Sequence, residues 1–260
     1  MQDTSLKLPQ WISHRGVHTS LPENTLAAFG LSRQQGFTCV EFDVLLTQDA
    51  VPVVIHDETV DRTTMGQGRV NTYSYAALRQ LRLRNASPWI RIPTLDQTLT
   101  YLTAVGLQAN IEIKTATHPH APLDFLTKER LDLMQNQRNA RLSCSILRAH
   151  PDGQYLISSF CMAALFEVRR CLPRISIGIL CEFKNWESEW PQKRNVLRHY
   201  CQAFNAYSLH INDCELTRKR VAELKQICPR ILVYTINDPR RAVELFNWGI
   251  TSVFTDCVTA

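Results

Sequence analysis

The sequence predicts an α/β fold, a single TIM (β/α)₈ barrel, and three observations support this prediction. Strand-like and helix-like segments alternate along the whole chain, which is typical of βα units. Only residues 47–50 separate the second strand-like run from the third, so these two runs must form an antiparallel hairpin, because a parallel crossover needs a dozen or more residues. The length of 260 residues matches the roughly 250 that one such barrel takes.

Apolar runs separated by turn residues define the expected elements. Helix-like runs cover residues 22–35, 72–84, 95–105, 123–136, 161–171, 190–203, 215–228 and 239–248. Strand-like runs cover residues 10–14, 39–46, 51–56, 109–114, 155–160, 175–181, 204–211, 231–236 and 251–255. Because the run at 51–56 is the returning arm of the hairpin, eight strands remain, and all of them can run parallel.

Residues 57–94 are too many for an ordinary βα loop, and they contain two glycines, two prolines and one expected helix. We expect this segment to be an insertion that covers the carboxyl-terminal rim of the barrel, together with the hairpin. Two smaller α/β domains are the alternative organisation, but no Gly/Ser-rich linker divides the chain. We therefore expect residues 1–260 to form one domain.

The composition favours a globular protein and excludes several other classes. Hydrophobic residues make up 45% of the chain and charged residues 20%, which is neither a disordered nor a fibrous composition. No apolar run approaches the ~18 residues that span a membrane. The first residues show no basic region followed by an apolar core, and no lipidation motif is visible. We expect a cytoplasmic protein without stable membrane insertion.

The cysteine pattern agrees with a reducing compartment. The nine cysteines are odd in number, and none are spaced as the C-x₂₋₄-C pairs of a zinc site. Most lie in apolar segments, where reduced cysteines serve as small core residues.

The net charge of +5 does not predict a nucleic-acid partner. Residues 1–130 carry 12 basic and 12 acidic groups, whereas residues 131–260 carry 17 and 12. The densest basic patch is the triplet 218–220, which is more typical of a solvated helix face than of a nucleic-acid footprint. We expect a small molecule to be the partner, and the sequence leaves the oligomeric state open.

Charged residues gather near the ends of the first strands. Alternation along a strand places Glu41 and Asp43 on one face of the run at 39–46, and Glu112 and Lys114 on one face of the run at 109–114. Their apolar neighbours, such as Phe42, are expected to face the surrounding helices. The acids then converge on the barrel axis at the carboxyl-terminal rim, where the active sites of such barrels lie.

Three carboxylates that meet at this rim predict a site for a hard cation, either Mg²⁺ or Ca²⁺. Glu41, Asp43 and Glu112 are the candidate ligands. The alternative is an internal salt-bridge network of these acids with Lys114 and Arg15. The residues themselves leave both interpretations open.

Two histidines are expected beside the acids. His14 ends the first strand, and the hairpin returns His56 to the level of Glu41. Two histidines beside a cation can act as general acid and general base in a displacement at phosphorus. Arg15 offers a planar guanidinium to phosphate oxygens, and Lys114 offers a compact positive charge. This set of groups suits a phosphodiester substrate better than a sugar or a peptide.

The same motifs resemble those of the glycerophosphodiester phosphodiesterase family. The resemblance is carried in order by the following segments: His14-Arg15-Gly16, Pro22-Glu23-Asn24-Thr25, Glu41-Phe42-Asp43, His56-Asp57, Arg62-Thr63-Thr64, Asn110-Ile111-Glu112-Ile113-Lys114, Ser158-Ser159-Phe160, Val233-Tyr234-Thr235-Ile236-Asn237 and Thr255-Asp256. It spans residues 11–256. In the C-terminal half, the segments 209–212 and 231–235 most resemble the cytoplasmic bacterial enzymes.

The resemblance implies a TIM barrel that hydrolyses glycerophosphodiesters to sn-glycerol 3-phosphate and an alcohol with the help of a divalent cation. It implies that Glu41, Asp43 and Glu112 are the metal ligands and that His14 and His56 are the catalytic acid and base. Arg15 and Lys114 would hold the phosphate. Many relatives have Gly where Ala50 stands, and we expect Gln48 or Asp49 to take the strained turn position instead.

Several interpretations stay open at this stage. The segment 22–25 is typical of a helix start, and the segments 62–64 and 210–212 are as typical of ordering or packing as of substrate contact. A lysophospholipase D-like activity and a catalytically silent phosphodiester-binding module are the alternative functions. The sequence leaves four points open. They are the released alcohol, the choice between Mg²⁺ and Ca²⁺, the formation of a cyclic phosphate, and which histidine is the acid and which the base.

Overall fold

The protein is described by a computed structural model that covers residues 6–114 and 125–257. The strands are β1 (Trp11–His14), β2 (Cys39–Leu46), β3 (Pro52–Val54), β4 (Gln108–Ile113), β5 (Tyr155–Ser159), β6 (Ser176–Cys181), β7 (Ser208–Asn212), β8 (Ile231–Tyr234) and β9 (Ser252–Thr255). The helices are α1 (Leu26–Gln34), the 3₁₀ helix η1 (Val70–Thr72), α2 (Tyr75–Leu78), α3 (Leu95–Val105), α4 (Phe125–Arg148), α5 (Met162–Cys171), α6 (Trp186–Ala203), α7 (Arg218–Lys225) and α8 (Pro239–Asn247).

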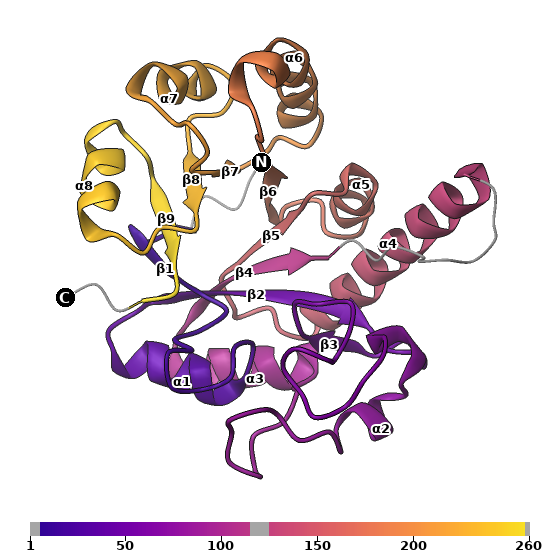
Figure 1. Cartoon of the computed structure of the whole chain (residues 1–260). Helices are drawn as coiled ribbons and strands as arrows, with labels where there is room; N and C mark the ends of the chain where they lie inside the picture. Colours follow the sequence, from indigo (N-terminus) through magenta and orange to yellow (C-terminus); the bar gives the residue numbers. More distant parts are fainter. Residues whose placement is uncertain (1–5, 115–124, 258–260) are drawn as a thin grey trace.

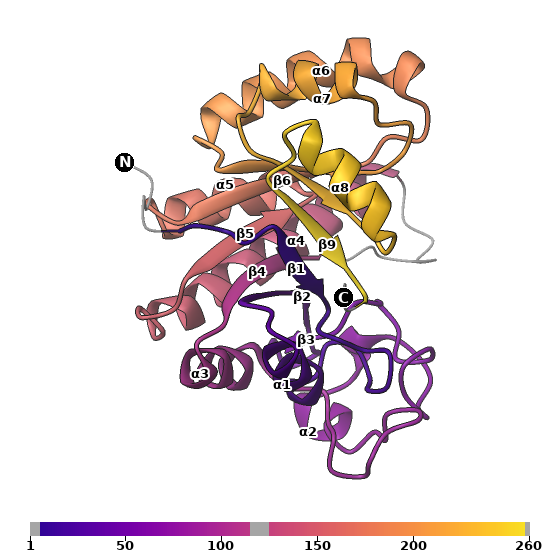
Figure 2. The ribbon, with the colours of Figure 1, turned by 90° about the vertical axis from the view of Figure 1, so that its left-hand side faces the viewer.

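Eight parallel strands close into a barrel, as the sequence predicts. The strand order is β1-β9-β8-β7-β6-β5-β4-β2-β3, and β1 also pairs with β2, which closes the ring. Helices α1 and α3 lie on one side of the barrel and α6, α7 and α8 on the other (Figure 1). Seen from the side, β9 runs next to β1, so the last strand completes the sheet that the first one begins (Figure 2).

Apolar side chains on both faces of the strands explain the barrel. All eight residues of β2 are buried, as expected for a strand covered by helices outside and by other strands inside. Phe42 points outward, with its ring 5.6 Å from that of Phe29 in α1. A second apolar cluster, which includes Ile12, Leu156 and Leu232, fills the inside of the barrel. The predicted outward direction of Phe42 is therefore confirmed.

The hairpin that settled the strand count is present. Strand β3 pairs with β2 in antiparallel register, with Val44 opposite Val54 and Leu46 opposite Pro52. The turn is held by the Thr47 hydroxyl, which lies 2.6 Å from Asp49 Oδ1. Our expectation for the strained position is wrong, because Ala50 itself has the positive φ of 61°. The bond from the Ala50 amide to the Thr47 carbonyl, 3.0 Å long, closes the turn in this conformation.

Residues 57–94 pack on a small apolar cluster of their own, which includes Val60, Val70 and Leu83. The expected helix at 72–84 is largely wrong, since only η1 and the four residues of α2 are helical. The following residues turn back instead, and the segment 82–84 lies alongside 63–65, with Thr64 opposite Leu83 in an antiparallel bridge. This pairing satisfies backbone groups that a longer helix would have used.

Helices α1 and α7 are shorter than predicted, whereas α4 and α6 are extended at one end. Helix α4 continues to Arg148, because Ala140, Cys144 and Leu147 extend its buried face beyond the predicted end at 136; residues 123 and 124 of the predicted helix lie outside the described residues. Helix α6 begins at Trp186 rather than at 190, because the Asn185 side chain caps it. In the described part of the chain, no helix is long and apolar enough to cross a membrane.

We predict that Ala50→Gly stabilises the protein. A left-handed conformation strains an alanine by ~1 kcal/mol, and glycine adopts it without strain. The free energy of unfolding, measured with urea, should rise by about 1 kcal/mol. The matched control is Ala104→Gly, the same change at an exposed position in α3, which should lower the free energy of unfolding by a similar amount. A loss of stability in Ala50→Gly would contradict the strain at this turn.

Candidate active site

The predicted site residues meet at the carboxyl ends of β1, β2 and β4. His14 is the last residue of β1 and lies opposite Glu41 in the parallel register with β2. Asp43 lies opposite Glu112 in the register of β2 with β4. Two strand pairings therefore bring four of the predicted residues to one edge of the barrel.

Glu41, Asp43 and Glu112 form a compact acidic triad. One oxygen of each carboxylate lies within 4.8 Å of the others. Glu41 and Asp43 are 4% and 1% exposed, and the Glu112 side chain is 12% exposed. This cluster is one of all-oxygen ligands, the kind that a hard cation prefers.

The three carboxylates of the triad repel one another, and this repulsion raises the pKa values of two of them. Burial raises the pKa of Glu41 well above its usual range, and the carboxylates of Asp43 and Glu112 raise it further. Burial and Asp43 raise the pKa of Glu112 to about 7. Burial acts in the same direction on Asp43, but the charges of Lys114 and Arg15 outweigh it and hold the pKa of Asp43 below its usual value.

Two cationic side chains lie against the triad. Lys114 Nζ is 3.0 Å from Glu112 Oε1 and 3.5 Å from Asp43 Oδ1. Arg15 Nε is 3.4 Å from Asp43 Oδ2, and the Arg15 amide donates to Glu41 Oε2 at 3.1 Å. The salt-bridge network considered as an alternative is thus present. It pairs two cations with three carboxylates, so a further positive charge would balance the triad.

His14 is oriented by an aspartate from the other end of the chain. Its Nδ1 lies 2.6 Å from Asp256 Oδ1, and its Nε2 lies 3.8 Å from Glu41 Oε2. Burial alone would raise the pKa of Asp256, but hydrogen bonds from His14 and Asn237 lower it to about 2. The ionised Asp256 accepts a hydrogen bond from Nδ1–H of His14, which leaves Nε2 directed at the acidic triad.

His56 has the same kind of partner. Its Nδ1 lies 2.6 Å from Asp57 Oδ1, and Asp57 also accepts a hydrogen bond from Arg62 Nε at 2.6 Å. Burial lowers the pKa of His56 below its usual value. The imidazole is therefore neutral at pH 7, with Nδ1 as the donor and Nε2 free to accept a proton.

The loop after β1 places Arg15 through unusual backbone geometry. Arg15 and Asn24 have positive φ angles of 56° and 58°, and the Asn24 amide donates to the Arg15 carbonyl at 2.9 Å. Asn24 Nδ2 donates to Asp43 Oδ2 at 2.9 Å. Helix α1 starts only at Leu26, with Thr25 as its N-cap. The segment 22–25 therefore starts the helix and also supports the acidic triad.

Six of the seven predicted site residues line a pocket of about 220 Å³, and the seventh, Asp43, is buried. Its apolar wall consists of Phe160, Leu180, Tyr234 and Phe254. The rest of the lining is polar or charged: His14, Arg15, Glu41, His56, Asn110, Glu112, Lys114, Glu182, His210 and Thr235. The rings of Phe160 and Tyr234 meet edge to face, with centroids 6.4 Å apart. A pocket of this size and polarity fits a small molecule that has an ionic part and a carbon skeleton.

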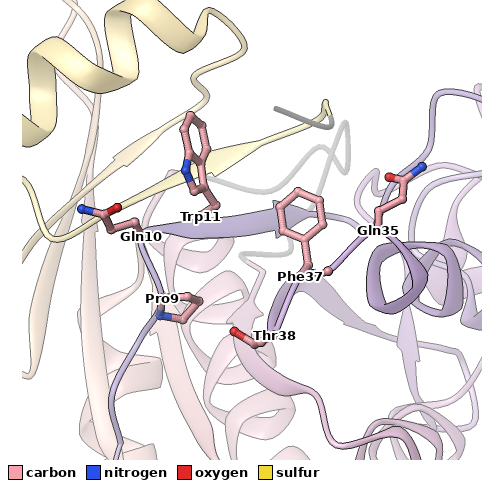
Figure 3. A pocket seen from close by; sticks show the side chains of 7 residues that line it. Pro9, Gln10, Trp11, Gln35, Phe37 and Thr38 are labelled. Carbon is pink, nitrogen blue, oxygen red and sulfur yellow. The ribbon is translucent and has the colours of Figure 1, made fainter. Parts of the chain in front are cut away.

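A second cavity lies at the opposite end of the barrel. It has a volume of about 360 Å³ and lies between Trp11 at the start of β1 and Thr38 just before β2 (Figure 3). None of the residues that line it carries an ionisable side chain. The first pocket is therefore the candidate active site.

Comparison with known proteins identifies the family. A model of the glycerophosphoryl diester phosphodiesterase family matches residues 14–260. The chain belongs to this family. The prediction made from the motifs is therefore confirmed, and so is the TIM barrel that it implied.

Relatives of similar length support the assignment to the glycerophosphoryl diester phosphodiesterase family. A glycerophosphodiester phosphodiesterase of Caldanaerobacter subterraneus is 28% identical over 249 residues, which cover 94% of this chain and 93% of the relative. The solved structure of an Oleispira antarctica phosphodiesterase in complex with the product sn-glycerol-3-phosphate is 30% identical, with a TM-score of 0.77 and coverage of 96% and 93%. A structure from Silicibacter pomeroyi, at 21% identity and a TM-score of 0.78, shows the same fold, with coverage of 96% and 90%.

Several residues of the quoted motifs have roles in this family member's site that the sequence did not assign. Asp57 and Asp256 orient the two histidines. Arg62 forms ion pairs with both Asp57 and Glu23, and the Asn212 side chain bonds the backbone of Phe183. Both residues therefore order the site.

We predict that Gly16→Ala destabilises the protein by more than conformational strain alone. Gly16 has a φ of 75°, and a Cβ there would lie 2.8 Å from the Cβ of Ala28 in α1. Strain and overpacking together should lower the free energy of unfolding by roughly 2–4 kcal/mol. The control is Gly36→Ala, where φ is 88° and a Cβ meets nothing within 4 Å. It should lose only about 1 kcal/mol. Equal losses in a urea titration would refute the close approach at Gly16.

Proposed function

We propose that this chain hydrolyses glycerophosphodiesters to sn-glycerol 3-phosphate and an alcohol, with a divalent cation held by Glu41, Asp43 and Glu112. The observation that carries the proposal is the convergence of an acidic triad and two aspartate-oriented histidines on one pocket. The product bound to the Oleispira antarctica phosphodiesterase supports the substrate class. The whole chain would act as one catalytic domain, with residues 57–94 as its insertion.

The donor set fits Mg²⁺ or Ca²⁺. Both are hard cations with oxygen ligands, and the raised pKa values of Glu41 and Glu112 reflect a repulsion that a cation would relieve. When bound, the cation supplies a Lewis acid next to the phosphate.

The protein's own groups divide the remaining work. Arg15 and Lys114 bind phosphate oxygens and stabilise their charge in the transition state. The Nε2 atoms of His14 and His56 serve as the acid and base: one takes a proton from the attacking nucleophile, which is water in the step that releases glycerol 3-phosphate, and the other protonates the departing oxygen. Asp256 and Asp57 are positioning residues, since they hold each imidazole in the tautomer that exposes Nε2.

The apolar wall receives the carbon skeleton of the substrate. Phe160 is 40% exposed at the mouth of the pocket, and the Tyr234 hydroxyl is tied to the Cys181 carbonyl at 3.2 Å. The tyrosine ring is therefore fixed, whereas the phenylalanine is open to a ligand. We propose that these rings pack against the alcohol or the glycerol.

The proposal includes the cytoplasm as the site of action. Its support is the set of nine free cysteines, of which Cys39, Cys144, Cys181, Cys201 and Cys228 are buried as thiols. Thiols in a core persist in a reducing compartment.

The direct test of this function is a product assay. Release of glycerol 3-phosphate would be followed from glycerophosphocholine, glycerophosphoethanolamine and glycerophosphoglycerol, and from a lysophospholipid. We expect release from at least one glycerophosphodiester, loss of that release with a chelator, and recovery with Mg²⁺ or Ca²⁺. Glu41→Gln, which removes one ligand charge at constant shape, should raise the cation concentration for half-maximal rate at least about tenfold.

Three results would refute the proposal. Release of glycerol 3-phosphate that is insensitive to the chelator would exclude a role for the cation in the reaction. Hydrolysis of the lysophospholipid alone would favour the lysophospholipase D-like alternative. Binding of glycerophosphodiesters without any release would favour the silent module.

The histidines provide a second prediction. His14→Ala and His56→Ala should each lower kcat by about 10²–10⁴, because each removes a general acid or base. Asp256→Asn should lower kcat about 10–100-fold with little change in KM, because it disturbs only the orientation of His14.

The matched control lies on the outside of the barrel. His150 Nε2 bonds Asp96 Oδ1 at 2.9 Å, which is another histidine–aspartate pair. His150→Ala and Asp96→Asn should keep the normal kcat. Near-normal kcat in His14→Ala or His56→Ala, with the fold intact by circular dichroism, would overturn the assigned roles.

A further inference from the structure

The insertion contains a long segment with positive charge only. Residues 62–95 include six arginines and neither aspartate nor glutamate. Four of these arginines, Arg79, Arg82, Arg84 and Arg91, lie between α2 and α3, and the first three are exposed. None of the four forms an ion pair with any residue that the structure describes.

The same segment carries Trp89, the most exposed large hydrophobic side chain of the described residues, and Arg79 and Arg91 line one groove with it. Trp89 is 86% exposed, on the loop that leaves α2, and this loop projects from the molecule at the bottom of Figure 1. Arg91 donates to the Ile90 carbonyl at 3.0 Å, so its side chain stays beside the loop. Met65, 65% exposed, lies next to Arg84, with 3.8 Å between its Sδ and the guanidinium.

A groove of about 670 Å³ continues from this loop toward α1 and α3. Its lining is mainly apolar and includes Leu26, Tyr75, Trp89, Ile92 and Tyr101. Arg79, Arg91 and Asp96 also border it, and Asp96 is bonded to His150. Apolar side chains that are rimmed by unpaired positive charge mark an interaction surface rather than a solvated face.

We propose that residues 79–91 form a peripheral docking surface for an anionic lipid bilayer. Indole rings favour the boundary between headgroups and acyl chains, and arginines near such a surface are attracted to its negative charge. Trp89 would enter the headgroup layer, while Arg82 and Arg84 contact the anionic headgroups.

Two features favour a bilayer over another macromolecule. The tryptophan stands on a projecting loop at the border of the groove, and its 86% exposure leaves most of the ring open to a soft interface. Residues 79–91 contain no acidic residue that would orient a partner protein, and Asp96, which borders the groove, is bonded to His150. The association is peripheral and reversible, since a few arginines and one indole supply much less binding free energy than a spanning helix.

The docking surface includes none of the residues proposed for catalysis. The inference does not depend on the proposed function, and the two can be tested apart. Docking would bring the enzyme to a lipid surface without altering hydrolysis of a substrate dissolved in water.

The test is partition onto sedimented vesicles at low ionic strength. We expect binding to vesicles of phosphatidylcholine and phosphatidylserine, much weaker binding to pure phosphatidylcholine, and weaker binding in high salt. The double variant Arg82→Ala/Arg84→Ala should bind about 25-fold more weakly, at about fivefold per arginine or ~1 kcal/mol each. Trp89→Ala should bind about tenfold more weakly, because the indole contact is lost.

Control variants remove similar groups elsewhere. Arg218→Ala/Lys219→Ala takes two charges from exposed positions in α7, and Val243→Ala truncates an exposed apolar side chain of α8. Both should bind vesicles normally, and every variant should keep the wild-type rate on a soluble substrate.

Several results would overturn the proposal. The first is a wild-type chain that does not bind anionic vesicles. The second is vesicle binding by Trp89→Ala and by Arg82→Ala/Arg84→Ala that equals wild-type binding. The third is tighter binding of the wild-type chain to a single-stranded oligonucleotide than to vesicles. A dimer in solution that Trp89→Ala converts to a monomer would show instead that the surface joins two copies of the chain.

Discussion

The register between β2 and β4 is the constraint on which the site depends. It sets Asp43 directly opposite Glu112, and Glu41 follows two residues earlier on the same face of β2. Like charges on neighbouring strands repel, so this register is stable only with compensating groups nearby. Lys114, Arg15 and Asn24 all contact Asp43. The positive φ angles of Arg15 and Asn24 are the conformations that bring two of these groups into place.

A second layer of groups supports the first one. Arg62 joins Asp57, the partner of His56, to Glu23, which is a partner of Arg15. The insertion is therefore connected to the loop after β1 by ion pairs. The hairpin contributes in the same way, because β3 turns the chain back and returns His56 to the rim. Each excursion from the regular barrel supplies one side chain that the eight βα units do not provide.

Much of the fold and of the candidate site could be predicted from the sequence, and the errors have physical causes. The barrel followed from the length of the crossovers, and the direction of Glu41 and Phe42 followed from strand alternation. The helix predicted at 72–84 does not form over its second half, because residues 82–84 pair with residues 63–65. A local sequence pattern does not predict this pairing. The partnership of His14 with Asp256 joins residues 242 positions apart, so only closure of the barrel reveals it. The left-handed position falls at Ala50 because of the turn hydrogen bond to Thr47, which residue type does not reveal.

The closure of the barrel by β9 has a consequence for the synthesis of the protein. Strand β1 is completed on one side by β2 and on the other by β9, and the aspartate that orients His14 follows β9 directly. All seven predicted site residues lie within the first 114 positions, so they emerge from the ribosome early. His14, however, gains its partner Asp256 only when β9 docks against β1. A nascent chain therefore carries all seven of these groups before it has the contact that orients His14.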